Sequence, residues 1–280
     1  MNIQVHIVKA FTHNTYQGNP AGIIFDADDL NDQQMKNITA LTQFSECAFI
    51  QRSQVANVKI RFFTALQEVD LCGHATIAAF YLIAKKFPAG FRCLTQETRA
   101  GILPVYCHPN GIIQMEQKSP EFIDHIASEQ EIAQLLNIST SSITGPIQIV
   151  STGTPKLLIP IDTLTTLCSI SPHLDGISAY CRSSGARGFY AFTHQTLESS
   201  SNFHARQFNP LAGINEDPIT GIAAGGLAAY AQKHKLLREA VCVIEQGHCL
   251  GKFGKMTVTM KDKILVGGYA VSVGIKTYII

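Results

Sequence analysis

The stretch EVDLCGHATIAAFYLIAKK, residues 68–86, joins a group of reactive side chains to an apolar helix. From Ala75 onward nearly every residue is apolar, and the run continues to about Lys86, with Pro88 placed to stop the helix. A helix that is apolar on nearly all its sides must be buried on all its sides. We therefore predict a sheet that curls around this helix.

A second stretch of the same kind lies near the other end of the chain. Small and apolar residues predict a long helix over about 219–235. Around the two helices, the halves of the chain repeat three signals in the same order, about 140 residues apart. The matched pairs are GNPAGIIFDADDL at 18–30 with GTPKLLIPIDTL at 153–164, RFFTAL at 61–66 with RQFNPL at 206–211, and DLCGHATIAA at 70–79 with DPITGIAAGG at 217–226. Three ordered matches predict an internal duplication, with two similar domains related by a pseudo-twofold axis.

These signals together predict an α+β fold. Each domain is expected to be a curled mixed β-sheet, barrel-like, around one central α-helix. GNPAG at 18–22 has the composition of a turn, and the strand IIF is expected to follow it. SPEFIDHIASEQEIAQLLNIS at 119–139 has the appearance of a domain boundary. Arg61 and Arg206, which open one of the repeated signals, are expected to organise strands rather than to bind substrate.

The composition excludes several classes of partner. The 280 residues carry 22 basic and 21 acidic side chains, a net charge of +1, so no strong field attracts nucleic acid or an anionic membrane. The N-terminus lacks a basic segment followed by a long apolar run, and the run from Ala75 to Ala84 is too short to span a bilayer. We expect a cytoplasmic protein. Charged residues make up 15% of the chain, against about 25% in typical domains, which favours a buried homodimer interface.

The cysteine and histidine patterns predict neither a metal site nor a disulfide framework. None of the eight cysteines forms a C-x-x-C pair, and none of the ten histidines belongs to an H-E-x-x-H motif. In a chain of this length without a secretory signal, free thiols are expected.

The starts of the two apolar helices favour an anion. Helix N-termini carry unpaired N–H groups and about half a positive charge. The amides around Gly73–His74 and Gly221–Ile222 are therefore expected to bind a small carboxylate. If both helix starts face one cleft, they also stabilise an enolate-like transition state. This geometry outlines a proton-transfer site that still needs an acid or a base.

Five side chains near the helix starts are candidates for that acid or base. Glu46 lies in TQFSECAFI, between a helix and an apolar strand, where partial burial suits a carboxyl to shuttle protons; alternatively, it only ends the helix. His74 is either functional or a core histidine with its hydrogen bonds satisfied. Cys72 is either an inert buried thiol or one activated by the helix N-terminus. Asp70 is expected to be an N-cap, and Asp217 is either an N-cap or functional.

Motifs along nearly the whole chain resemble those of the phenazine-biosynthesis-like (PhzF-like) family of isomerases. The matching stretches are GNPAG at 18–22, SECAFI at 45–50, RFFT at 61–64 with EVDLCGHAT at 68–76, STGTPKLLIP at 151–160, NEDPITG at 215–221 and EQG at 245–247. The resemblance implies a fold similar to that of diaminopimelate epimerase, with two domains and an active site in the cleft between them. In that fold the final strands return to the first domain. The expected domains are therefore residues 1–116 with about 268–280, and residues 117–267.

The resemblance implies a cofactor-independent isomerase that acts on a small carboxylate-bearing substrate by acid/base proton transfer. Glu46 matches the family's catalytic proton shuttle, and His74 and Asp217 match its supporting residues. The positions expected to bind substrate are Gly73, Gly221, Ile222, Asn19 and Cys72. No organic cofactor and no metal are implied.

One position departs from the family pattern, and this departure leaves alternative functions open. Where the family reads D-P-x-T-G-S, this chain reads DPITGI, so Ile222 can neither hydrogen-bond a substrate nor relay a proton. This departure favours a ligand-binding or partner protein on the same scaffold as one alternative. A two-thiol racemase or epimerase is another, and it needs a thiol at each helix start. Cys72 supplies one thiol, but the repeat places Thr220 at the other start, where a hydroxyl is too weak an acid.

Overall fold

The computed structural model describes residues 1–14, 17–86, 90 and 92–280. The chain divides into two compact units. The first unit consists of Met1–Glu116 and Gly267–Ile280, and the second of Gln117–Val266. Of the helices in the described ranges, the longest is α6 with 13 residues, and none is long and apolar enough to cross a bilayer.

The first unit is a mixed sheet with two helices. Its elements, in chain order, are β1 (Asn2–Ala10), β2 (Asn19–Ile24), α1 (Asp32–Thr42), β3 (Cys47–Gln51), β4 (Val58–Phe63), β5 (Glu68–Val69), α2 (Gly73–Ala84), β6 (Arg92–Thr98), β7 (Gly101–Cys107) and β18 (Ala270–Ile279). The chain leaves this unit through β8 (Ile113–Gln117) and returns through β17 (Ile264–Gly268). β1 pairs antiparallel with β18 and β2, whereas β2 with β3 and β4 with β6 pair in parallel.

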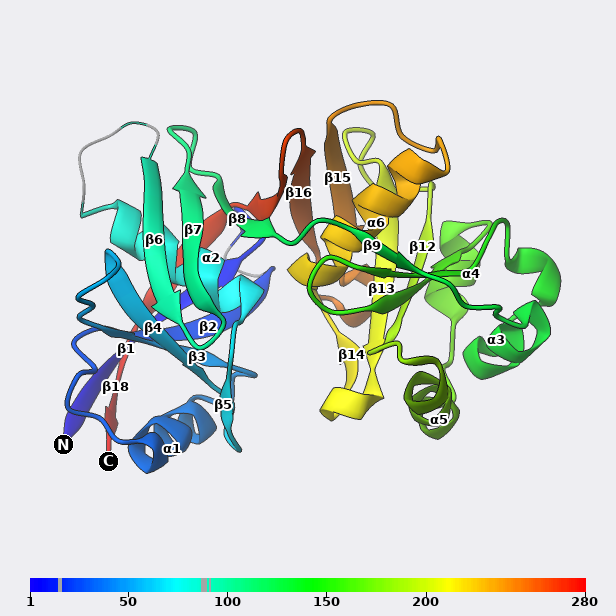
Figure 1. Ribbon diagram of the computed structural model, residues 1–280. Coiled ribbons are helices and arrows are strands. Elements are labelled where there is room, and N and C mark those ends of the chain that lie inside the picture. The colour runs from blue at the N-terminus through cyan, green and yellow to red at the C-terminus, as the bar shows by residue number, and fades with distance from the viewer. Residues whose placement is uncertain (15–16, 87–89, 91) are drawn as a thin grey trace. The chain divides into compact units, whose positions relative to one another are not determined.

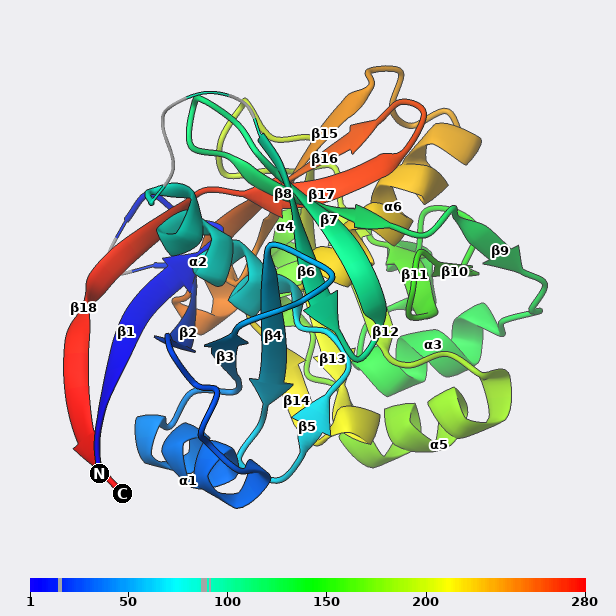
Figure 2. The same cartoon turned by 60° about the vertical axis from the view of Figure 1, so that its left-hand side comes forward.

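α2 is the central helix of the first unit. It packs against β1, β2, β3, β7 and β18, and Figures 1 and 2 show strands on opposite sides of it. Its side chains from Ala75 to Phe80 are fully buried. The prediction of a sheet curled around this apolar helix is therefore confirmed. Pro88, which the sequence predicts to stop the helix, lies outside the described residues.

The segment at 18–22 differs from its prediction. β2 begins at Asn19, so the expected turn over GNPAG is wrong, and of these five residues Gly18, with φ +84°, lies outside the strand. Pro20 pairs with β1 only, because β3 joins β2 from Gly22 onward. A proline, which has no N–H to donate, is tolerated in a strand where one side stays unpaired.

The second unit is also a mixed sheet around a helix. Its strands and α-helices are β9 (Glu121–Ile123), α3 (Glu129–Leu136), β10 (Gln148–Ser151), β11 (Lys156–Pro160), α4 (Leu164–Ser169), α5 (Leu174–Ser184), β12 (Phe189–Thr193), β13 (Phe203–Asn209), β14 (Ile214–Asp217), α6 (Gly221–Lys233), β15 (Val241–Gln246) and β16 (Gly254–Met260), with the 3₁₀ helices η1 (Thr140–Ser142), η2 (Pro210–Ala212) and η3 (His248–Leu250). β11 with β12 and β13 with β15 pair in parallel, and β12 with β13 and β15 with β16 pair antiparallel. α6 packs against β10, β11 and β16 and is buried along most of its length. Both units thus confirm the α+β prediction, and the pseudo-twofold axis stays a prediction.

Each unit joins two strands with the same arginine–glutamate pair. Arg61 of β4 donates to both carboxylate oxygens of Glu68 on β5, at 2.9 and 2.7 Å. Arg206 of β13 donates to both carboxylate oxygens of Glu216 on β14, at 2.8 Å each. In both units the guanidinium also lies over the phenylalanine two positions later in its own strand. The prediction that these arginines organise strands is confirmed.

Candidate active site

Glu46 is held at the entrance of a buried strand. α1 ends with Gln43 in the left-handed conformation, φ +59°, and the chain turns into β3 at Cys47. β3 pairs with strands on both its sides, β2 and β4, which fixes its position in the sheet. Glu46 is the residue immediately before this strand, and its side chain is 15% exposed.

His74 is the second residue of α2, and its side chain is 10% exposed. Cys72 is the N-cap residue, and its carbonyl accepts hydrogen bonds from the Thr76 N–H (2.9 Å) and hydroxyl (2.8 Å). Among the described residues no side chain caps this helix start. The first-turn amides therefore remain available to an anion. A Cβ built on Gly73 would meet the Met115 sulfur at 3.8 Å and no other atom of the described residues within 4 Å, which leaves room beside these amides.

The Glu46 carboxylate and the His74 imidazole face each other without bonding. His74 Nε2 lies 3.6 Å from Glu46 Oε2, which exceeds a hydrogen-bond distance. Both atoms are buried, and neither has a hydrogen-bond partner within the described ranges. A buried polar atom left unsatisfied costs about 1–3 kcal/mol, a cost that is usual at sites of function. The arrangement suits a reacting group that bonds to both atoms.

Cys72, His74 and Glu46 bring their side chains together in one cluster. The ligand atoms of the three residues lie within 4.8 Å of one another, and their types suit zinc. However, His74 turns Nδ1 toward the Cys72 sulfur at 3.5 Å and Nε2 toward Glu46. Each ring nitrogen of His74 therefore has its own polar neighbour, an arrangement that suits a ring that takes up a proton on one nitrogen and releases it from the other.

In the second unit, Asp217 and Gln246 organise the start of α6. Thr220, the N-cap residue, donates its hydroxyl to Asp217 Oδ2 at 2.7 Å. Gln246 donates to the Asp217 carbonyl at 2.8 Å and to the Thr220 hydroxyl at 3.1 Å, and it accepts from the Thr220 N–H. Asp217 is therefore not the N-cap of α6. It fixes the residue that is the N-cap.

A second glutamine holds the first turn of α6 from the other side. Gln117 donates to the Gly221 carbonyl at 3.0 Å and accepts from the Thr152 hydroxyl at 2.6 Å. A Cβ on Gly225 would lie 1.9 Å from the Gln117 Oε1, so this contact requires glycine. The sequence predictions missed Gln117, because 104 residues separate it from Gly221. The sequence indicates Gln246 only as part of the EQG motif at 245–247.

Other predicted positions have mixed outcomes. The N-cap prediction for Asp70 is wrong, because Cys72 holds that position, and Asp70 is an exposed partner of Arg99 at 3.4 Å. Asn19 is buried at the start of β2, and Ile222 is half-buried in the first turn of α6. Their roles in substrate binding stay predictions, as do the shared cleft and the homodimer.

Known proteins resemble the chain over its full length. The family model described as phenazine biosynthesis-like protein (PhzC-PhzF) matches residues 8–274. The uncharacterized isomerase YddE of Escherichia coli (strain K12) is 35% identical, over 97% of this chain and 96% of its own. The uncharacterized isomerase YfhB of Bacillus subtilis (strain 168) is 32% identical, over 91% of this chain and 89% of its own. The crystal structure of a PhzF-family phenazine biosynthesis protein from Bacillus anthracis superimposes with a TM-score of 0.91 at 30% identity, over 100% of both chains.

The residues that the family model matches include the segments that hold Glu46, His74 and Asp217. The chain belongs to the phenazine-biosynthesis-like (PhzF-like) family of isomerases.

Proposed function

We propose that this protein is a cofactor-independent isomerase that moves a proton within a small carboxylate-bearing substrate. The observation that carries the proposal is the pair of buried, unbonded atoms, Glu46 Oε2 and His74 Nε2, at the start of an uncapped helix. Glu46 Oε2 accepts no hydrogen bond from the described residues, so this oxygen is free to accept a C–H proton. Glu46 takes that proton from one carbon and returns it to another.

The helix start supplies the charge stabilisation that this step needs. Removing a proton next to a carboxylate develops negative charge on the carboxylate oxygens, and the α2 amides at Gly73 and His74 can donate to them. The His74 ring, whose Nδ1 lies 3.5 Å from the Cys72 sulfur and whose Nε2 lies 3.6 Å from Glu46 Oε2, holds the substrate against the base or donates to it through Nε2. At α6, Gly221 and Ile222 offer a second anion site of the same kind.

The two-thiol racemase receives no support from the second helix start. Thr220, the counterpart of Cys72 in the repeat, has its hydroxyl engaged with Asp217 and Gln246. A threonine hydroxyl held this way is a structural donor, and its acidity is far below that of a thiol. The first helix start alone cannot provide two opposed thiols.

The proposal is tested by solvent exchange. Cyclic, α-hydroxy and α-amino carboxylates are incubated with the protein in D₂O, and NMR detects the carbon at which deuterium enters. We expect deuterium to enter a substrate at an acidified C–H next to an unsaturated or carboxylate group. Cys72→Ser should retain this exchange, and Glu46→Gln should lose it. Exchange at an amino-acid α-carbon that is lost in Cys72→Ser overturns the proposal in favour of a racemase. Tight binding of one of these carboxylates without any exchange overturns it in favour of a binding protein.

A further inference from the structure

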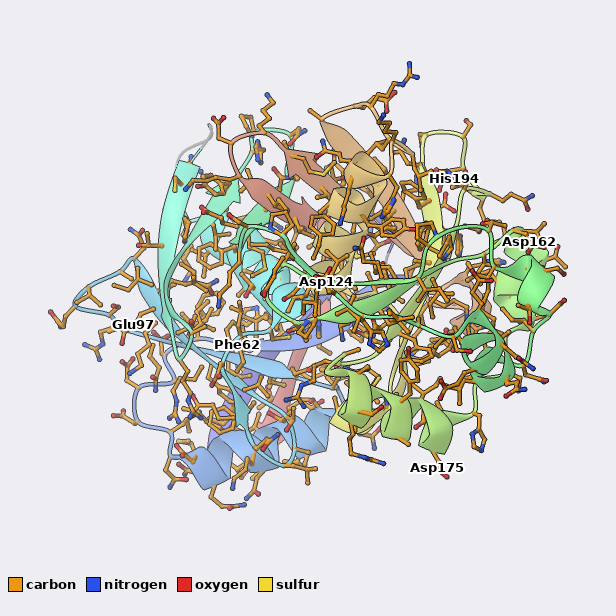
Figure 3. All side chains as sticks on the ribbon, turned by 45° about the vertical axis from the view of Figure 1, so that its right-hand side comes forward. Phe62, Glu97, Asp124, Asp162, Asp175 and His194 are labelled. Atoms are coloured by element: carbon orange, nitrogen blue, oxygen red, sulfur yellow. The ribbon has the colours of Figure 1, made fainter. Side chains whose placement is uncertain are left out.

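Two thiols of the second unit meet although 81 residues separate them. Cys168 lies in α4 and Cys249 in η3, and the Cys249 thiol donates to the Cys168 sulfur at 2.7 Å. Both residues are partly exposed, so small molecules in solution can reach the pair. Figure 3 labels Asp162, two residues before α4 begins, and Asp175, in the helix that follows α4.

A cation borders the pair. Arg206 Nη1 donates to the Cys168 carbonyl at 3.4 Å and to the Leu167 and Ile170 carbonyls at 2.9 Å each. Burial, together with the neighbouring Cys168, raises the pKa of the Cys249 thiol to about 12. Cys249 therefore keeps its proton, and Cys168, which accepts the S–H hydrogen bond and whose carbonyl accepts from the guanidinium, is the sulfur placed to attack first.

The Cys249 side of the pair is joined to the start of α6. Cys249 lies three residues after Gln246, and Gln246 donates hydrogen bonds to Asp217 and Thr220. Gly247, between Gln246 and Cys249, has φ +89° and packs against the backbone just before α6. A Cβ at this position would lie 2.7 Å from the Pro218 carbonyl oxygen. A covalent bond to Cys249 therefore restrains the turn that holds the α6 N-terminus.

We propose that Cys168 and Cys249 are a redox modification site that closes to an intramolecular disulfide with a low-molecular-weight disulfide as oxidant. The Cys168 thiolate attacks one sulfur of that oxidant, forms a mixed disulfide and releases one thiolate. Cys249 then loses its proton and attacks the Cys168 sulfur, which releases the second thiolate. Two protein thiols give up two electrons and two protons, and the oxidant becomes two thiols. This site is independent of the proton-transfer chemistry at Glu46.

The test uses the full-length protein in glutathione buffers of increasing oxidised fraction, followed by alkylation and mass spectrometry. We expect the thiols of Cys168 and Cys249 to be lost together, with one crosslink between their peptides, reversed by dithiothreitol. Cys249→Ser should stop at a glutathione adduct on Cys168, and Cys168→Ser should leave Cys249 unmodified. Cys93→Ser, at an exposed thiol outside the pair, should form the crosslink as the wild type does.

Two results overturn the proposal. One is the survival of the free thiols of Cys168 and Cys249 under conditions that glutathionylate Cys93. The other is a crosslink that forms equally in Cys168→Ser or Cys249→Ser. Serine is close to cysteine in size, and circular dichroism checks that each variant is folded. Slower amide hydrogen exchange at residues 217–221 in the oxidised protein is expected, and unchanged exchange there contradicts the coupling to α6.

Discussion

Removing the buried Arg206 guanidinium should destabilise the second unit strongly. In Arg206→Met, Glu216 loses both of its charge-assisted hydrogen bonds, and its carboxylate is only 14% exposed. The Leu167 and Ile170 carbonyls lose a donor at the same time. Breaking a buried pair by removing one partner costs about 3–5 kcal/mol, mostly because a charge is left uncompensated. We expect a loss of about 4 kcal/mol in the free energy of unfolding.

The matched control is the corresponding arginine of the first unit. In Arg61→Met, Glu68 still has Arg99 at 3.6 Å, and within the described ranges Arg61 donates to no backbone carbonyl. We expect a loss of about 2 kcal/mol, because the remaining carboxylate keeps a cation. Both variants lose an arginine that joins two strands. The difference between their unfolding free energies therefore measures the cost of the uncompensated Glu216 charge and of the carbonyls that lose a donor.

The assay is urea unfolding with linear extrapolation. The chain has no tryptophan, so far-UV circular dichroism and tyrosine fluorescence are the probes. Adding Glu216→Leu to Arg206→Met should recover part of the loss, because no buried charge remains. The reasoning is refuted if Arg206→Met costs no more than Arg61→Met, or if the double variant is less stable than Arg206→Met.

Three further predictions concern the second unit. Burial lowers the pKa of Lys156 from 10.5 to about 8, so the unfolded chain holds more protons between these values. The unfolding free energy of the wild type should rise by about 3 kcal/mol relative to Lys156→Met from pH 8 to 10.5, and a constant difference contradicts this. Gly225→Ala should cost about 2 kcal/mol in urea unfolding, because the new methyl group overlaps a glutamine oxygen; Gly226→Ala, with its nearest atom at 3.7 Å, should cost nothing. Burial raises the pKa of Glu245, but hydrogen bonds from His204 and from backbone amides outweigh this and lower it overall. Stability should thus fall as the pH drops below about 4.5, and Glu245→Gln should flatten that decline; an unchanged decline in the variant would be evidence against this account.

The central helices were predictable because their signal is local. α2 and α6 are apolar on nearly every side, and burial is the only way to satisfy such a surface. The repeat then predicted a second curled sheet from the first. The turn over 18–22 was wrong because strand pairing overrode the local preference of glycine and proline.

The candidate site was less accessible to sequence reasoning. Residue chemistry alone left Glu46 and His74 ambiguous, and the family resemblance singled them out. Their 3.6 Å approach depends on how β3 and α2 meet, which no local pattern encodes. Gln117 has no sequence signal at all, since its bond to Gly221 spans 104 residues. Asp70 has a residue type suited to N-caps but lies two positions before the actual N-cap.

The most direct test of the central claim is the rate at which Glu46→Gln exchanges substrate protons with solvent. Glutamine keeps the shape of the side chain but cannot take up a proton, and general base catalysis contributes about 10²–10⁴-fold. The account predicts that the variant loses at least about 10²-fold in the NMR-detected exchange rate, while Glu121→Gln, at an exposed glutamate of β9, keeps the wild-type rate. Exchange by Glu46→Gln at the wild-type rate would contradict the account.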